Sequence, residues 1–195
     1  PGGAYSIIGI GVDYGQQNAT TFQAFGLGGE SLDGLGEYYH SGRNAGKQRS
    51  PGDYARDFVA FTDSLRERFQ CGHFYVFIDP SAQGLAEEIK RAIANRPYTV
   101  TMRNAENAVA LGISRVQKLL TFGRISLAPE QKEAAREFGR YEYDPKSIER
   151  GNEQPIKEDD HCMDAIRYCV MGLWKKARHY LPPEIRQTEP EGVIR

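Results

Sequence analysis

Three aspartates are the side chains whose positions point to chemistry in this sequence. Asp13 follows the apolar run 5–12, Asp79 follows the apolar run 74–78, and Asp164 lies far along the chain, close to His161. Clustered carboxylates repel one another unless a cation neutralises them, and their hard oxygen atoms select Mg²⁺ or Mn²⁺. Two such ions about 4 Å apart activate a water molecule and stabilise the leaving oxygen of a phosphodiester. If the three aspartates meet in the fold, they favour metal-dependent phosphodiester hydrolysis.

The stretch that begins at residue 159 is predicted to be a helix that presents the third aspartate. Asp160, His161 and Asp164 share one helical face by their spacing. Asp159 or Asp160 is suited to cap the first turn. A second face is apolar at helical period, which predicts docking on a core. Its members are Cys162, Ile166, Cys169, Val170 and Leu173. The alternative is that His161 and Asp164 belong to a solvated face.

The remaining elements are predicted from periodicity and turn residues. Short β-rich runs at 5–12, 20–27 and 35–40 have brief links and predict an antiparallel meander. The continuous apolar run 74–78 is typical of a central parallel strand reached through a helical crossover. The predicted helices are 54–69, 85–93, 105–122, 129–140 and a last one ending near 179, and the further strands are 98–102 and 124–127. Residues 41–52 and 144–157 are expected to be loops.

This order predicts an α/β fold of the ribonuclease H-like type. Its sheet is mixed, with five or more strands, three antiparallel and then parallel ones, and helices flank it. We expect one such domain over residues 1–181 and a disordered tail over 182–195. Functional groups gather beyond strand ends in open sheets, so Asp13 and Asp79 should face each other if runs 5–12 and 74–78 are neighbours. Each aspartate also has a simpler explanation as a turn former.

Composition limits the class of protein. Hydrophobic residues make up 39% and charged residues 26% of the 195, as in ordinary globular domains. The formal net charge of -1 argues against tight nucleic-acid binding through charge alone. Three cysteines without paired spacing indicate a reducing compartment. Because no apolar run reaches the length of a membrane span and the start lacks the build of a signal peptide, we expect neither membrane association nor secretion.

Three motifs together resemble the nuclease domain of the large terminase subunit of tailed bacteriophages. They are residues 11–15 (Gly-Val-Asp-Tyr-Gly), 77–81 (Phe-Ile-Asp-Pro-Ser) and 160–168 (Asp-His-Cys-Met-Asp-Ala-Ile-Arg-Tyr), in the order of that family. The resemblance covers nearly the whole chain, and the third motif is the most specific.

The resemblance implies a ribonuclease H-like metal-dependent endonuclease. It would cut double-stranded viral DNA with little sequence preference during genome packaging in the host cytoplasm. Asp13, Asp79 and Asp164 would hold two Mg²⁺ or Mn²⁺ ions, with Asp13 bridging both. His161 would be a second-metal ligand, a water-orienting base, or neither, and Asp160 is a fallback ligand that has capping as its alternative. An ATPase motor domain in the full-length chain, the portal and the small terminase subunit are the implied partners.

The loop 41–52 contains a glycine-rich basic segment, 42–48 (Gly-Arg-Asn-Ala-Gly-Lys-Gln). It is one residue short of a P-loop and ends in Gln rather than Ser or Thr, so we expect no ATP hydrolysis from it. Arg43, Lys47 and Arg49 are candidates for contacts with DNA phosphates, with a solvated loop as the alternative.

Three other functions remain open at this point. A junction resolvase or transposase-type nuclease would keep the fold and change the DNA substrate. A DNA-docking or portal-docking module would keep the fold without catalysis. The segment 9–15 also loosely matches the first phosphate loop of an actin-like or sugar-kinase-type phosphate-binding half, but such enzymes need a second, similar lobe for which this chain has no room.

Overall fold

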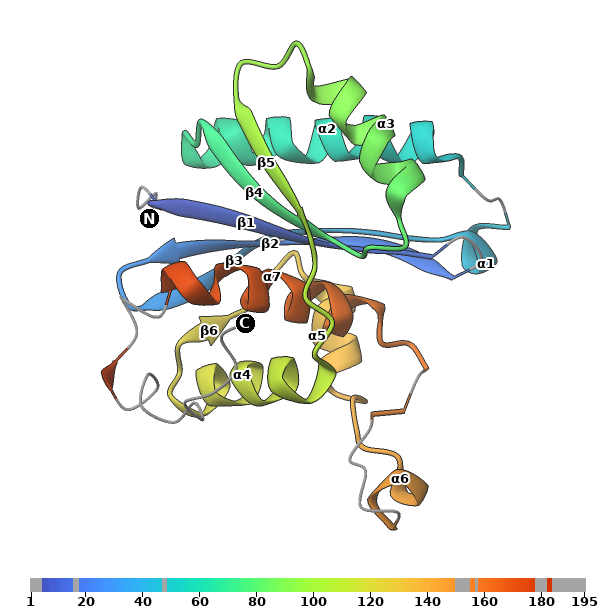
Figure 1. Cartoon of the computed structure of the whole chain (residues 1–195), viewed down its shortest axis with the longest axis vertical. Coiled ribbons are helices and arrows are strands. Elements are labelled where there is room, and N and C mark those ends of the chain that lie inside the picture. The colour runs from blue at the N-terminus through green and yellow to red at the C-terminus, as the bar shows by residue number, and fades with distance from the viewer. Residues whose placement is uncertain are drawn as a thin grey trace.

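The computed structural model describes residues 5–15, 18–46, 49–149, 155–156, 158–177 and 182–183. These residues form one six-stranded sheet with helices on both faces (Figure 1). The strands lie in the order β5-β4-β1-β2-β3-β6. Their bounds are β1 (Ile7–Tyr14), β2 (Ala19–Gly28), β3 (Ser31–Ser41), β4 (His73–Ile78), β5 (Thr99–Asn104) and β6 (Ile125–Ser126).

The sheet is mixed, as predicted. Strand β2 pairs antiparallel with both β1 and β3, whereas β4 pairs parallel with β1 and with β5. The short edge strand β6 pairs parallel with β3. The neighbouring β1 and β4 point the same way, so their carboxyl ends reach the same edge of the sheet. This is the ribonuclease H-like arrangement that the sequence predicts.

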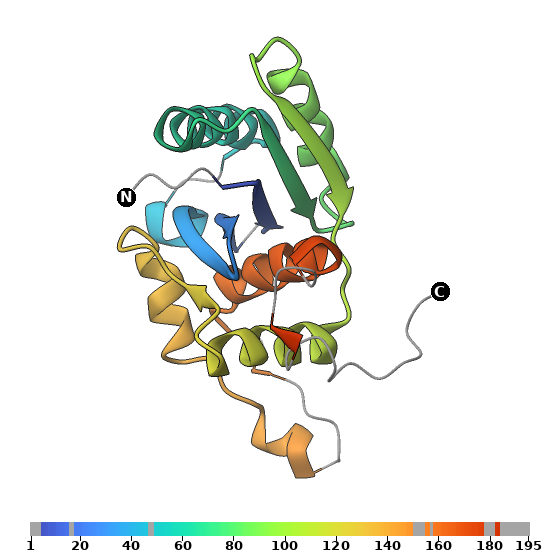
Figure 2. The ribbon, with the colours of Figure 1, turned by 90° about the vertical axis from the view of Figure 1, so that its left-hand side faces the viewer.

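In the described part of the chain, helices lie on both sides of the sheet (Figures 1 and 2). The first face carries α2 (Pro51–Phe69) and α3 (Gln83–Ile93). The second carries α4 (Val109–Thr121), α5 (Lys132–Phe138) and α7 (His161–Ala177), with α7 lying directly on β1, β2 and β4. Among the described residues, no helix is both long and apolar enough to cross a membrane.

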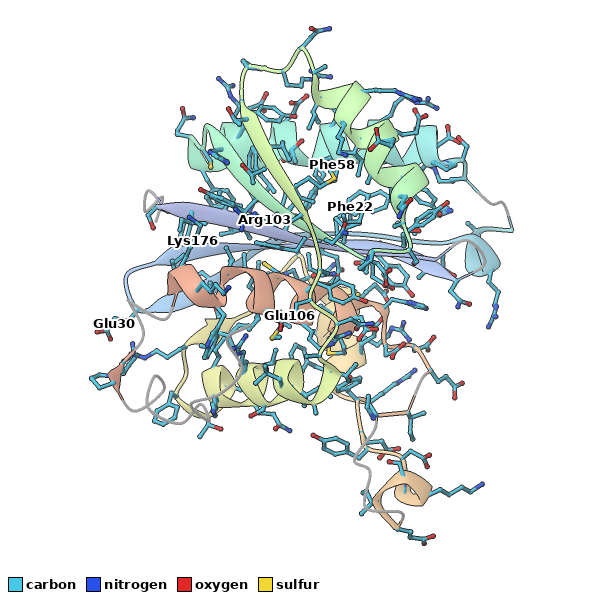
Figure 3. All side chains as sticks on the ribbon, viewed as in Figure 1. Phe22, Glu30, Phe58, Arg103, Glu106 and Lys176 are labelled. Atoms are coloured by element: carbon cyan, nitrogen blue, oxygen red, sulfur yellow. The ribbon has the colours of Figure 1, made fainter. Side chains whose placement is uncertain are left out.

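Alternation along β1 divides the core into two layers. Ile8, Ile10 and Val12 face α2 and α3 and are fully buried there. In the same layer, Phe22 packs edge-on against Phe58 with 5.3 Å between ring centroids (Figure 3). The intervening residues 9, 11 and 13 face the opposite side, where α7 lies. The period of two therefore directs Asp13 toward the helix that bears Asp164.

Two expected loops contain short helices. Residues 41–52 include α1 (Gly42–Ala45), and residues 144–157 include α6 (Pro145–Glu149), which lies apart from the other helices in Figure 1. Helices of four or five residues are too short to show a periodic apolar face, which is why their sequence does not reveal them. The expected disordered tail, 182–195, lies outside the described residues except for 182–183. The extent of the domain over 1–181 stays a prediction.

Candidate active site

Asp13 is the carboxylate at the centre of the candidate site. It is the penultimate residue of β1, and its side chain is 14% exposed. The close packing of α7 on β1 explains this burial. A Cβ on Gly11 would lie 1.8 Å from the carbonyl oxygen of Ala165, so the helix backbone touches the strand directly. Only glycine permits that approach, which brings the first turn of α7 over the end of β1.

Asp79 lies beside Asp13 because of the strand register. Val12 pairs with Ile78, and the backbone N–H of Asp79 donates to the carbonyl of Val12 at 3.3 Å. Asp79 Oδ1 accepts the backbone N–H of Ser81 at 2.7 Å, and its Oδ2 accepts the hydroxyl of Tyr168 at 3.0 Å. Burial pushes the pKa of Asp79 upward, but the hydrogen bonds from Ser81 and Tyr168 outweigh burial and lower it overall. Asp79 is therefore ionised at neutral pH.

Asp164 reaches the same region from α7. Its Oδ1 accepts hydrogen bonds from Nε and Nη2 of Arg167, at 3.3 and 2.9 Å. Both side chains are largely buried, with 14% of Asp164 and 2% of Arg167 exposed. The expected alternative, a fully solvated polar face, is therefore wrong for Asp164.

His161, the first residue of α7, contacts Asp13 directly. Its Nδ1 lies 2.9 Å from Asp13 Oδ2. The hydrogen bond to Asp13 raises the pKa of His161, although burial opposes this rise. The pair therefore keeps its shared proton to higher pH than an isolated imidazole would. Asp160, the fallback ligand, precedes the helix and is 7% exposed.

The three carboxylates influence one another electrostatically. Burial raises the pKa of Asp13, the contact with His161 opposes that rise, and the negative charges of Asp164 and Asp79 add to it. Asp13 is thus the buried member of a group in which like charges are close together. A divalent cation would relieve this repulsion.

The donor set fits a hard divalent ion in its chemistry, although the carboxylates do not converge on one point. Within the described part of the chain, no three acidic, histidine or cysteine side chains stand close enough together to hold a metal ion. Each aspartate is instead engaged by a protein donor: Asp13 by His161, Asp79 by Tyr168, and Asp164 by Arg167. The three carboxylates have to approach one another further before they can act together as ligands.

Glu137 caps α7 and was not found from the sequence. This carboxylate on α5 is 1% exposed, and its Oε2 accepts the backbone N–H groups of Cys162 at 2.7 Å and Met163 at 3.3 Å. The sequence favoured Asp159 or Asp160 for the cap because both adjoin the helix, and the carbonyl of Asp160 does accept the backbone N–H of Asp164 at 2.9 Å. Glu137 lies 25 residues before Cys162, so only the fold brings it there. Burial raises the pKa of Glu137 to about 7, against the opposing effect of these hydrogen bonds.

A cavity of about 570 Å³ adjoins the site on the side of His161. Arg43 lies exposed on α1 and lines this cavity. Arg49 is held by Asp57 in an ion pair of 2.8 Å and is not among the lining residues. Lys47 lies outside the described residues. Of the three basic candidates, Arg43 is thus the one that lines a cavity together with His161.

Comparison with known proteins places this geometry among terminases. A large terminase from a thermophilic bacteriophage, in complex with ATP-gamma-S, is 32% identical, with a TM-score of 0.75 over 87% of this chain and 41% of that one. This chain therefore spans about two fifths of that protein. The large terminase nuclease from thermophilic phage G20c with bound magnesium is 20% identical, with a TM-score of 0.55 over 84% and 79% of the two chains.

A third likeness lies outside bacteriophages. The human cytomegalovirus terminase nuclease domain, soaked in manganese with an inhibitor bound, is 13% identical, with a TM-score of 0.54 over 65% of each chain. No protein-family model and no curated protein matches the sequence. The resemblance to the large terminase is confirmed, and the fold is that of the terminase nuclease domains.

Proposed function

We propose that this chain, with the fold of terminase nuclease domains, is a Mg²⁺- or Mn²⁺-dependent endonuclease that cuts double-stranded viral DNA with little sequence preference during genome packaging. The main support for the proposal is the buried Asp13. It lies beside Asp79 through the β1–β4 register, and the negative charge of Asp164 raises its pKa. The magnesium bound to the G20c nuclease and the manganese soaked into the cytomegalovirus domain support the choice of ions.

The three aspartates are the proposed metal-binding residues. Bound ions would supply an activated water and charge stabilisation at the leaving oxygen of the phosphodiester. Asp13, on which the charges of both other carboxylates act, would be a ligand of both ions. Nδ1 of His161 lies 2.9 Å from Asp13 Oδ2, and this contact fixes the orientation of that carboxylate. The helix α7 brings His161 and Asp164 to the strand ends together, so both are oriented by one rigid element.

Substitution of single aspartates by asparagine tests the proposal. Asp13→Asn, Asp79→Asn and Asp164→Asn each keep the side-chain shape and remove the charge that binds the ion. We expect each to abolish plasmid cleavage in Mn²⁺ while the far-UV circular dichroism stays that of the wild type. Arg115→Lys, on α4, is the control and should cleave normally. Full activity in any one aspartate variant removes that residue from the proposed mechanism.

Substrate and metal assays separate the remaining alternatives. A junction resolvase of the same fold would cut branched DNA in preference to linear duplex, whereas the proposed enzyme would cut both at similar rates. A non-catalytic docking module would show no binding of Mn²⁺ by calorimetry. The cavity lined by Arg43 and His161 favours the nuclease, because it leaves room for a DNA strand beside the histidine that contacts Asp13.

The proposal extends to partners through the length of the relatives. Because the chain spans 41% of the large terminase that was solved with ATP-gamma-S, an ATPase domain in the full-length protein is proposed as its covalent partner. The portal and the small terminase subunit are proposed as assembly partners, and the host cytoplasm as the location. Pull-down of the full-length protein with a purified portal tests the first of these contacts.

A further inference from the structure

Arg167 is an almost completely buried charged side chain near the carboxylates, and its contacts converge on Asp164. It lies one turn after Asp164 on α7, and both Nε and Nη2 donate to the same oxygen, Asp164 Oδ1. Nη2 also donates to Oδ1 of Asn107 at 3.0 Å, in the segment between β5 and α4. Two guanidinium donors directed at one oxygen fix the position of that oxygen, and the positive charge favours the ionised carboxylate.

The next residue, Tyr168, makes a comparable contact with Asp79. The hydroxyl of Tyr168 donates to Asp79 Oδ2 at 3.0 Å. The guanidinium carbon of Arg167 lies over the Tyr168 ring, 4.7 Å from its centroid. The two side chains therefore form one stacked unit that contacts two different candidate ligands.

Gly112 on α4 provides the space for this unit. A Cβ at this position would lie 2.4 Å from Cγ and 2.6 Å from Cδ of Arg167. Among the described residues, Nη1 of Arg167 has no hydrogen-bond partner, although it is buried. Leaving a buried donor unpaired is unfavourable, so another interaction has to offset it. Arg167 thus makes its hydrogen bonds to Asp164 and Asn107 while Nη1 stays buried without a hydrogen bond.

We propose that Arg167 and Tyr168 are positioning residues that orient Asp164 and Asp79 for binding of the two divalent ions. This inference rests on the proposed nuclease function. Two neighbouring carboxylates repel each other and tend to turn apart. The stacked unit opposes this movement, because the guanidinium of Arg167 is hydrogen-bonded to Asp164 and the phenol of Tyr168 is hydrogen-bonded to Asp79. Neither side chain contacts the DNA in this proposal, because both are buried.

Conservative variants separate geometry from charge. Arg167→Lys keeps the positive charge but loses the planar two-donor contact, and Tyr168→Phe keeps the ring but loses the hydroxyl. Asn107→Ala removes the second acceptor of the guanidinium at an exposed position, so its folding is not at risk. The control is Arg115→Lys, since Arg115 also stacks on an aromatic ring of α7, Trp174 at 4.7 Å, away from the carboxylates.

The measurements are Mn²⁺ binding by isothermal titration calorimetry and steady-state cleavage of linear duplex DNA. Loss of an outer partner of a metal ligand typically lowers affinity or activity by about 10–100-fold. We expect Arg167→Lys and Tyr168→Phe to bind Mn²⁺ about tenfold more weakly and to have a reduced kcat, with the KM for DNA unchanged. Asn107→Ala should change both in the same direction by less, and Arg115→Lys should match the wild type.

The outcomes distinguish this inference from the proposed function. If the wild type binds Mn²⁺ and cleaves DNA while Arg167→Lys, Tyr168→Phe and Asn107→Ala do so equally well, the two residues are structural and the inference alone is overturned. The same holds if the variants raise only the KM for DNA. If the wild type neither binds Mn²⁺ nor cleaves DNA, the nuclease proposal fails and takes the inference with it.

Discussion

At the scale of single residues, the sequence identified the acidic groups but not the side chains that hold them. Asp13, Asp79 and Asp164 were found because each follows or begins a recognisable element. Their partners Arg167 and Tyr168 stood in the same motif without an assigned role. Glu137 had no local signal at all, since its contact with α7 depends on where α5 packs. Roles that depend on long-range packing are invisible to motif spacing.

Glu137 gives a prediction about pH and stability. Its pKa is raised from 4.5 to about 7 in the folded protein, so the folded state binds more protons than the unfolded state between these values. Stability from this group is therefore fully present below pH 4.5 and falls as pH rises through 7, by about 3 kcal/mol. Glu137→Gln, which has no charge to bury, should lose this dependence.

Urea denaturation at a series of pH values checks this. The difference in unfolding free energy between Glu137→Gln and the wild type should shift in favour of the variant from about pH 5 to about pH 8. Glu133→Gln, on the same helix but partly exposed, serves as the control and should show no such trend. A constant difference across the range would contradict a raised pKa for Glu137.

At the scale of elements, the long periodic segments were predicted and the short ones were not. Helices α2 and α7 and strand β4 have strong apolar patterns, whereas α1 and α6 have four and five residues. The contact between α7 and β1 was also missed. Its signal was present in Gly9 and Gly11, which alternate with buried apolar residues and leave the α7 face of the strand without side chains.

Replacing either glycine tests how closely α7 must approach β1. Gly11→Ala brings a Cβ onto the backbone of Ala165, which cannot yield without moving the helix, so we expect a destabilisation of about 3 kcal/mol and loss of cleavage. Gly9→Ala meets the flexible end of Leu173 first, at 2.6 Å, and should cost about 1 kcal/mol. Thermal melting gives the order of the two variants, and equal effects would contradict direct backbone packing at Gly11.

At the scale of the whole molecule, topology was predictable because chain order limits it. Three strands with short links must form a meander, and a helical crossover must return a parallel strand to the same sheet. The register that sets Asp79 beside Asp13 followed once β1 and β4 became neighbours. Side-chain packing between the layers could not be predicted, because it depends on how side chains fit together in three dimensions. The contact of Arg167 with Gly112 is an example.

Metal binding should stabilise the molecule as a whole. An ion that binds only the folded state at about 100 times its Kd adds about 2.7 kcal/mol, which raises the Tm of a chain of this length by about 5–10 °C. We expect this rise for the wild type in Mn²⁺ by differential scanning calorimetry. Asp13→Asn should show no rise, because it lacks the proposed bridging ligand. An equal rise in both proteins would place the ion elsewhere.

The close seating of α7 on β1 has a consequence for how natural variation in such proteins would be read. Gly11 and Asp13 lie two residues apart on one face of one strand, and both have to be right before the helix can deliver Asp164. Selection for activity would then keep both positions equally invariant. Gly11 would be invariant because a larger side chain cannot fit there, and Asp13 would be invariant because it binds the ion. An alignment alone would therefore not distinguish the residue needed for packing from the metal ligand.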